Sequence, residues 1–183
     1  MEFDPDFTHI RRQDRAVEDE AWIEAFLQRS PFGMLATALQ DQPYVHGNLF
    51  VYDPHRRVIY LHTAIEGRTI SAVRNNPKVC FTAAEMGRLL PNAQARGFSV
   101  EYSSVVVFGV ARLVDEPEEM LYGLRLLMEK YAPHLKPGSD YRSLSESELE
   151  GVAVYCLEIA GWSAKRKQVQ GDFPGAYRFE DVI

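Results

Sequence analysis

The sequence predicts a mainly β, α+β fold in which six antiparallel strands form a small barrel with peripheral helices. Three observations indicate this fold. Apolar runs rich in β-branched and aromatic residues recur between turn signals, they do not alternate with helices as in a parallel sheet, and no repeat of fixed length occurs. Because 46% of the 183 residues are hydrophobic and 25% are charged, the composition is that of a globular domain and not of a disordered chain.

The first third of the chain predicts an arm, a helix and three strands. Residues 1–18 have no lasting period and are expected to form an N-terminal arm. A helix begins after Asp19, where negative charge is favoured, and its apolar face consists of Trp22, Ile23, Phe26 and Leu27. Turn residues then separate the strands of an antiparallel meander, which are expected at 33–39, 43–52 and 57–63.

The middle of the chain adds a short helix, two strands and a loop. The helix is predicted over 66–76, because it must end before Pro77. A strand over 78–84 follows, and then a loop over 85–97, of a length that usually indicates function or an interface. The next strand, over 98–114, is long enough to bend at Gly109.

The last third predicts one long helix and the final strand. Pro117 opens the helix and Pro133 closes it. Ser145 and Glu148 have the spacing of a capping box that starts one helical turn, before a last strand over 152–162. The tail either packs on the barrel or covers a pocket. The predicted organisation is an N-terminal arm at 1–18, one domain at 19–165 and a C-terminal tail at 166–183.

Charge and cysteine content exclude several classes of protein. A net charge of -6, without a basic cluster longer than 165–167, argues against nucleic acid as a partner. No apolar run approaches the roughly 20 residues that cross a bilayer, and the first residues are acidic, so a cytoplasmic location is expected. Cys80 and Cys156 lie in apolar runs and are interpreted as core thiols, with a disulfide between them as the alternative. No Rossmann, P-loop, dithiol or zincin motif occurs, and no metal site is predicted.

Four segments in the same order resemble one known family. Residues 60–69, which end a strand and open a helix, resemble the flavin-phosphate segment of pyridoxamine-phosphate-oxidase-like proteins, and 43–50, 102–111 and 154–165 agree with it. The chain is thus similar to this superfamily of FMN-binding split β-barrels, and most to its nitroimidazole-resistance (Nim-type) branch. The resemblance implies an FMN at the interface of a homodimer, with residues of both subunits around the ring.

The residues at the helix start fit a phosphate on chemical grounds. Gly67 lets the backbone approach closely, the first helical N–H groups are free, and Arg68 offers two parallel donors. The FMN phosphate is therefore assigned to Gly67, Arg68 and Thr69. Many relatives carry a lysine after the arginine, whereas Thr69 offers a hydroxyl without the positive charge.

Other residues enter through strand alternation or through the resemblance. His46 and Asn48 share a strand face, which is either a pocket wall or a solvent-facing surface. The resemblance places His62 beside the flavin, where it either transfers protons or only lines the site. It also places Ser104, Trp162 and Lys165 near the cofactor, and the alternative for Trp162 is a packing anchor. The predicted cofactor-binding residues are His46, Asn48, His62, Thr63, Ala64, Gly67, Arg68, Thr69, Ser104, Trp162 and Lys165, with His62 as the catalytic candidate.

Three hypotheses for function follow. The first is an FMN-dependent oxidoreductase in which reduced flavin passes electrons to a small organic acceptor such as a nitro compound. The second is a flavin-binding or flavin-storing protein without turnover, because a fold determines a site and not a chemistry. The third keeps the barrel and replaces FMN with haem or a deazaflavin, and haem would need His62 or His46 as an axial ligand.

Overall fold

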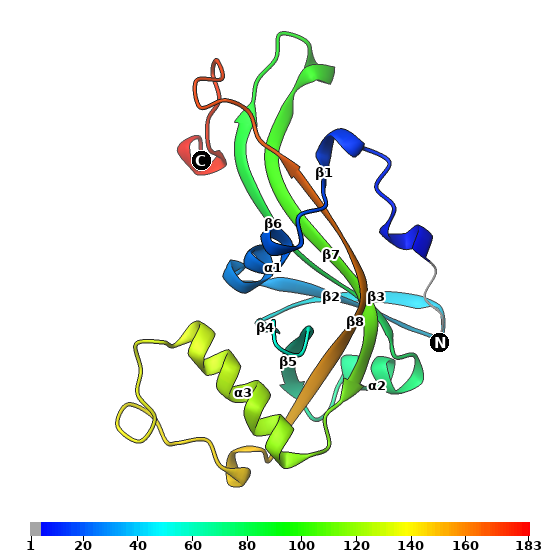
Figure 1. Ribbon diagram of the computed structural model, residues 1–183, viewed down its shortest axis with the longest axis vertical. Helices are drawn as coiled ribbons and strands as arrows, with labels where there is room; N and C mark the ends of the chain where they lie inside the picture. The colour runs from blue at the N-terminus through cyan, green and yellow to red at the C-terminus, as the bar shows by residue number, and fades with distance from the viewer. Residues whose placement is uncertain (1–4) are drawn as a thin grey trace.

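The computed structural model describes residues 5–183, and its centre is one antiparallel sheet of eight strands (Figure 1). The long strands β6, β7 and β8 run side by side along the length of the molecule, and the shorter ones complete the sheet. The strands are β1 (Ala16–Val17), β2 (Gly33–Leu39), β3 (Gln42–Asn48), β4 (Phe50–Asp53), β5 (Val58–Ala64), β6 (Lys78–Leu90), β7 (Ser99–Leu113) and β8 (Val152–Lys167).

The two edge strands of the sheet, β3 and β4, follow each other in the sequence. The order is β3-β2-β6-β7-β8-β5-β4, with β1 paired to β8, so β3 and β4 end the path and the sheet is not closed. Only Leu49 separates β3 from β4 in the chain. The mainly β, antiparallel fold is confirmed, and the structure adds two strands to the six expected.

The single strand expected over 43–52 is in fact two strands. The hydroxyl of Tyr131 lies 2.9 Å from the carbonyl oxygens of both Pro31 and Phe50 and accepts the Phe50 N–H at 3.1 Å. This hydroxyl therefore binds the backbone where β4 begins, and β4 pairs with β5 instead of continuing along β2. The second added strand, β1, has two residues and is too short to show an alternating pattern.

The loop expected over 85–97 is also shorter than predicted. Strand β6 continues to Leu90, with a register shift between Met86 and Leu89. Glu101 on β7 accepts both Nε and Nη2 of Arg88 at 2.9 Å, and Tyr177 of the tail pairs with Leu89. These cross-strand contacts involve residues distant in sequence, so local residue preferences did not predict them. The rest of the connection includes a 3₁₀ turn, Ala95–Gly97.

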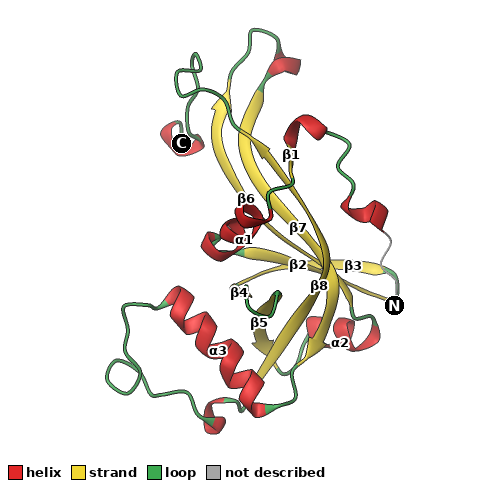
Figure 2. Cartoon of the chain, viewed as in Figure 1, coloured by secondary structure: helices red, strands yellow, loops and turns green. Residues whose placement is uncertain are grey.

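Three α-helices cover the sheet at its periphery (Figure 2). Helix α1 (Glu20–Arg29) begins at Asp19, whose Oδ1 accepts the Trp22 N–H at 3.3 Å as expected of an N-cap. Helix α2 (Arg68–Asn75) follows β5, and α3 (Pro117–Tyr131) begins at the predicted proline. The predicted turn after Ser145 is a 3₁₀ turn, Glu146–Glu148, and it has no side-chain cap.

Two hydrophobic clusters stabilise the fold. The larger one contains Phe26 and Leu27 of α1 with inward side chains of the sheet, including Phe81 and Val107. The smaller one lies between α3 and strands β4, β5 and β8, and it includes Cys156. Both cysteines are free thiols, and burial raises the pKa of Cys156 to about 11.

The bend predicted at Gly109 coincides with a bulge. The β7–β8 register shifts between Phe108 and Gly109, and a Cβ at Gly109 would lie 2.1 Å from the carbonyl oxygen of Glu158. Glycine is therefore required here, because any side chain would clash with backbone.

The two ends of the chain contact the sheet. Residues 1–4 of the predicted arm lie outside the described residues, and β1 pairs with β8 through Ala16 and Lys165. The tail packs against the end of β6, where Arg88 donates to the Gly171 carbonyl at 2.7 Å. None of the helices within residues 5–183 has the length and apolar character needed to cross a membrane.

Candidate functional site

The junction of β5 and α2 has the geometry of an anion site. Gly67 precedes α2 with φ of 138°, a conformation that favours glycine, and a Cβ here would meet no heavy atom within 4 Å. No side chain caps the helix start. The first N–H groups of an α-helix have no partner within the helix, so those of α2 remain available to a ligand.

Arg68, the first residue of α2, is exposed and has no carboxylate partner in the described part of the chain. Its guanidinium carbon lies 4.7 Å from the centroid of the Tyr44 ring. This cation–π contact orients the side chain without neutralising its charge. Thr69 is only 7% exposed, so its hydroxyl is much less open to a ligand than Arg68 is.

A row of polar side chains continues from Tyr44 along β3. Tyr44, His46 and Asn48 pair with Thr37, Leu35 and Gly33 of β2. All three partners are buried, so this face of β3 lies on the inner side of the sheet. The rings of Tyr44 and His46 stack at 5.6 Å with an interplanar angle of 14°.

Asn48 joins β3 to β5 at the place where the two ends of the sheet meet. Its Nδ2 lies 3.4 Å from His46 Nε2 and donates to the His62 carbonyl at 3.3 Å. The structure therefore brings the side chains of Arg68, His46 and Asn48 together with Tyr44, while His62 joins them through its backbone carbonyl. We call this set the polar row. The polar row consists of Arg68, Tyr44, His46, Asn48 and His62.

Burial lowers the pKa of both histidines in the polar row. Loss of hydration lowers the pKa of the His46 imidazole, which is half-buried. The same cause lowers the pKa of His62, although the residue as a whole is exposed in the single chain. Both imidazoles are therefore biased toward the neutral form near neutral pH. The Nδ1 atom of His46 is buried and has no hydrogen-bond partner within residues 5–183. When Asn48 donates to Nε2, the neutral ring carries its hydrogen on Nδ1, which leaves a donor without an acceptor.

Thr63 and Ala64 lie between His62 and the start of α2. The Thr63 hydroxyl lies 3.1 Å from the Tyr155 hydroxyl and donates to the Ala64 carbonyl at 2.9 Å, so protein partners hold it. Ala64 is exposed. Both residues border the candidate site, and their binding of a cofactor stays a prediction.

The other predicted residues lie elsewhere in the sheet. Strands β7, β6 and β2 separate β8, with Trp162 and Lys165, from β3. Ser104 and Lys165 are opposite each other in the β7–β8 register. Trp162 packs against the core, with the guanidinium carbon of Arg57 4.9 Å from its ring. Within one chain these three residues are not part of the polar row, and their role at the cofactor stays a prediction.

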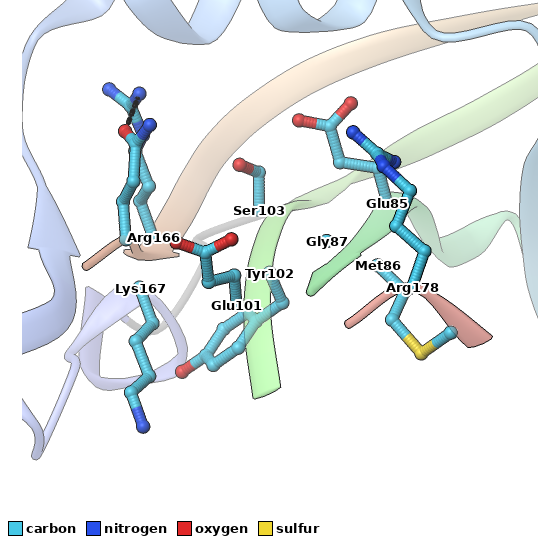
Figure 3. Close-up of a pocket in the computed structure, with 10 residues that line it drawn as sticks. Glu85, Met86, Gly87, Glu101, Tyr102, Ser103, Arg166, Lys167 and Arg178 are labelled. Carbon is cyan, nitrogen blue, oxygen red and sulfur yellow. Dashed lines mark hydrogen bonds between the residues drawn. The ribbon is translucent and has the colours of Figure 1, made fainter. Parts of the chain in front are cut away.

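A second pocket lies at the far ends of β6, β7 and β8 and contains none of the predicted site residues. Figure 3 shows Arg166, Lys167 and Arg178 around it together with Glu85 and Glu101. Both carboxylates are already paired, Glu85 with Arg29 at 2.6 Å and Glu101 with Arg88 at 2.9 Å. The arginine donors lower the pKa of Glu85 and hold that of Glu101 at about 2.

One family accounts for most of the chain. The sequence pattern of the family described as Pyridoxamine 5'-phosphate oxidase matches residues 19–166. The chain belongs to this family. No curated protein matches it significantly.

Solved structures share the fold of this pyridoxamine 5'-phosphate oxidase family member. The flavocytochrome Anf3 of Azotobacter vinelandii superposes with a TM-score of 0.78 at 23% identity, over 96% of this chain and 78% of that one. A proposed 5-nitroimidazole antibiotic resistance protein of Bacteroides thetaiotaomicron gives 0.68 at 23%, over 82% and 86%. A FAD and heme binding protein of Mycobacterium smegmatis gives 0.75 at 15%, over 85% and 74%. Flavin-binding proteins are thus among the structural neighbours of this family member.

Tyr44 is the member of the polar row that sequence reasoning did not select. Its position two residues before His46 put it on the same strand face, which was the available signal. Its contact with Arg68 joins residues from different elements, and spacing along the chain does not reveal such a contact.

Proposed function

We propose that this protein is a flavin-binding oxidoreductase that holds FMN between the start of α2 and the polar row. The observation that carries the proposal is the set of unsatisfied groups there. Arg68 has no counter-ion in residues 5–183, the start of α2 has no side-chain cap, and His46 Nδ1 has no acceptor. Buried polar groups in folded proteins normally have partners, so a bound ligand is the simplest reason for the unpartnered His46 Nδ1, and the exposed Arg68 and helix start are open to the same ligand.

At one end of the site, the phosphate of FMN would meet Arg68 and the N–H groups of the first turn of α2. The open space beside Gly67 leaves room for close approach to this backbone. A bidentate arginine and a helix N-terminus are a common combination for binding phosphate. Thr69 would contribute chiefly its backbone N–H, because the residue is buried.

At the other end, His46, Asn48 and His62 would contact the flavin ring. The unpartnered His46 donor needs an acceptor, and the carbonyl oxygens and nitrogens of an isoalloxazine supply several. When bound, the flavin supplies the transfer of electrons between a donor and an acceptor. His62, with its lowered pKa, would hold a proton or accept one at the exposed edge of the site.

We propose a small organic acceptor, with nitro compounds as the first class to test. The resemblance to nitroimidazole-resistance proteins suggests this class, and the structural similarity to one such protein at 23% identity supports the fold alone. A pair of mostly neutral histidines beside the ring suits a polar acceptor that takes up protons with its electrons.

The site is proposed to be completed by a second copy of this chain. The outer face of the sheet is apolar and partly exposed, with Phe32 at 47%, Met34 at 42% and Val45 at 57% exposure. The strand register continues this face across four strands in two rows, Val45-Ala36-Cys80-Phe108 and Gly47-Met34-Thr82-Val106. Ser104 and Lys165 lie on the same face, opposite to the side of the buried Val105 and Ala164. A homodimer through this face would bury the apolar rows and bring Ser104 and Lys165 toward the flavin of the other copy.

An absorption spectrum tests this proposal directly. The purified protein is mixed with FMN, desalted and measured, and one flavin per subunit is expected to remain bound. A haem band in protein purified without added cofactor would favour the haem alternative, and a colourless sample after FMN addition would exclude the flavin site. A thermal shift provides a second readout, because a ligand at a hundredfold excess over its dissociation constant stabilises a protein by about 2.7 kcal/mol.

Turnover separates an oxidoreductase from a flavin-storing protein. The FMN-loaded protein is mixed with a nicotinamide reductant and a nitroimidazole under anaerobic conditions, and loss of the nitro absorbance is followed. His62→Gln is expected to lower kcat and to change its pH profile while FMN retention is unchanged. A loaded protein that reduces no acceptor would support storage.

A further inference from the structure

The pocket at the far ends of β6, β7 and β8 takes no part in the proposed flavin site, and we call it the far-end pocket. It has a volume of about 260 Å³ and is lined by these strands and by Arg178 of the C-terminal tail. Its lining contains three cations, Arg166, Lys167 and Arg178, and two carboxylates, Glu85 and Glu101. The kind of ligand that it can hold depends on which of these charges are already paired.

Both carboxylates of the far-end pocket are neutralised by arginines outside its lining. Glu85 accepts Nη1 and Nη2 of Arg29 at 2.6 and 2.7 Å. Glu101 accepts Nε and Nη2 of Arg88, each at 2.9 Å. Each arginine donates to both oxygens of one carboxylate, which is a strong geometry for such a pair. The two carboxylates therefore leave little negative charge free to repel an anion.

The three cations of the far-end pocket are less fully paired. Arg166 and Lys167 have no carboxylate partner within residues 5–183, although each forms a hydrogen bond with a neutral side chain. Arg178 lies 3.8 Å from Glu180, but both side chains are exposed, and exposed pairs of this kind contribute little. The far-end pocket thus keeps an excess of positive charge in a chain whose net charge is -6, so it attracts anions.

The arrangement of the two arginines favours a ligand with two carboxylates. Arg166 belongs to β8 and Arg178 to the tail, and Figure 3 shows them on opposite sides of Ser103. Each guanidinium has parallel N–H donors that match the two oxygens of a carboxylate, as the pairs of Arg29 and Arg88 show nearby. A phosphate is commonly bound at the start of an α-helix, whereas within residues 5–183 the lining includes no residue of α1, α2 or α3.

We propose that the far-end pocket binds a small aliphatic dicarboxylate, with one carboxylate on Arg166 and the other on Arg178. Lys167 would add to the positive field around the ligand. Because Arg178 lies in the tail, the bound ligand would tie the tail to β8. The far-end pocket shares no residue with the polar row, so this proposal does not depend on the flavin site.

Titration calorimetry of the full chain with succinate, acetate and inorganic phosphate tests the class of ligand. Succinate is expected to bind at least about tenfold more tightly than acetate, because only succinate can pair with both arginines, and added salt should weaken its binding. Phosphate is expected to bind less tightly than succinate. Equal affinities for succinate and acetate, or tighter binding of phosphate, would overturn the assignment of the ligand, and absence of binding by all three anions would overturn the site.

Variants of the two arginines test where the ligand lies. Arg166→Gln and Arg178→Gln are each expected to lower the affinity for succinate to that for acetate, with unchanged melting temperatures because both residues are exposed. Arg142→Gln, at an exposed arginine that also pairs with a glutamate, is the matched control and should bind succinate as the wild type does. Succinate should also slow backbone hydrogen exchange in residues 170–178 of the wild type but not of Arg178→Gln. If either variant keeps the full affinity for succinate, the ligand does not bridge the two arginines and the proposal is wrong.

Discussion

Two regions of the protein, the far ends of strands β6 to β8 and the start of helix α2, differ in how their charged groups are paired. At the far ends of β6 and β7, where the tail packs, Arg88 binds Glu101 and two tail carbonyls, and Arg29 binds Glu85. At the α2 end, Arg68 contacts a tyrosine ring and no carboxylate of residues 5–183, and His46 keeps a buried nitrogen without a partner. In the first region both carboxylates are paired within the protein, while Arg166 and Lys167 beside them have no carboxylate partner in residues 5–183. What distinguishes the second region is the buried, unpartnered nitrogen of His46, which a ligand would complete. Unsatisfied polar groups, more than the number of charges, therefore indicate the candidate site.

The largest expected effect comes from the outer face. Val45→Lys places a charge in the apolar rows, and we expect it to convert the proposed homodimer into a monomer and to weaken flavin binding by at least about a hundredfold, because the interface would have to bury an unpaired charge. Sedimentation velocity and a flavin titration measure the two effects. Leu135→Lys, at an exposed apolar residue in the connection after α3, is the control and should change neither. A wild-type protein that binds flavin as a monomer would contradict the proposal that the site is shared between two copies, and the site would then have to be formed by one chain.

A crossed pair of arginine variants tests the contrast between the two ends. Arg68→Ala is expected to weaken FMN binding about 10- to 100-fold, because it removes charge-assisted hydrogen bonds to the phosphate, and to leave the melting temperature of the cofactor-free protein unchanged. Arg88→Ala is expected to lower that melting temperature by about 2–4 °C and to leave FMN affinity unchanged. Calorimetry and thermal unfolding of both variants provide the four values. If Arg68→Ala destabilises the cofactor-free protein as much as Arg88→Ala does, Arg68 is a structural residue.

Thr69→Lys adds a positive charge at the position where the family resemblance leads one to expect a lysine. A second cation at the start of α2 is expected to raise FMN affinity about three- to tenfold, an effect that salt should screen. The buried position predicts a lower melting temperature without cofactor, because a lysine there loses hydration. Titrations at low and high salt measure the gain, and Arg142→Lys, at a side chain that is 83% exposed, is the control. An affinity that does not rise would show that the phosphate lies away from the side chain of residue 69.

The smallest expected effect is a difference in the pH dependence of stability between His46, near the start of α2, and Glu101, near the far ends of β6 to β8. The folded pKa of His46 lies below its unfolded value, so the unfolded state binds more protons and stability falls as pH drops below about 6.5. Glu101 changes the stability only at lower pH, because its folded pKa of about 2 keeps its stabilising contribution intact until the pH falls below about 4. Between pH 7.5 and 5.5 the melting temperature of the cofactor-free protein should therefore fall, and His46→Gln should reduce that fall by about 2 °C. Glu101→Gln, the matched variant at the far end, should leave the fall unchanged over this interval.

Local patterns in the sequence determined the elements and the phosphate end of the site. Apolar runs between turn residues located β2, β5 and β7, Asp19 and Pro117 located helix starts, and Gly67 with Arg68 at a strand-to-helix junction indicated an anion site. These features depend on residues a few positions apart, where steric preference and hydrogen bonding act within one segment. The mainly β fold followed from them.

Tertiary contacts alone decided how the elements meet. The Tyr131 hydroxyl binds Phe50, next to the break at Leu49, from 81 residues away, and Arg88, Glu101 and the tail contact one another at the end of β6. The polar row likewise exists because the two ends of the sheet come together at Asn48 and because α2 lies beside Tyr44. Contacts of this kind leave no periodic signal along the chain, since their energy depends on the distance between segments in space. The sequence by itself therefore determined which residues have the chemistry that the proposed flavin site needs, and the tertiary structure decided which of them lie together.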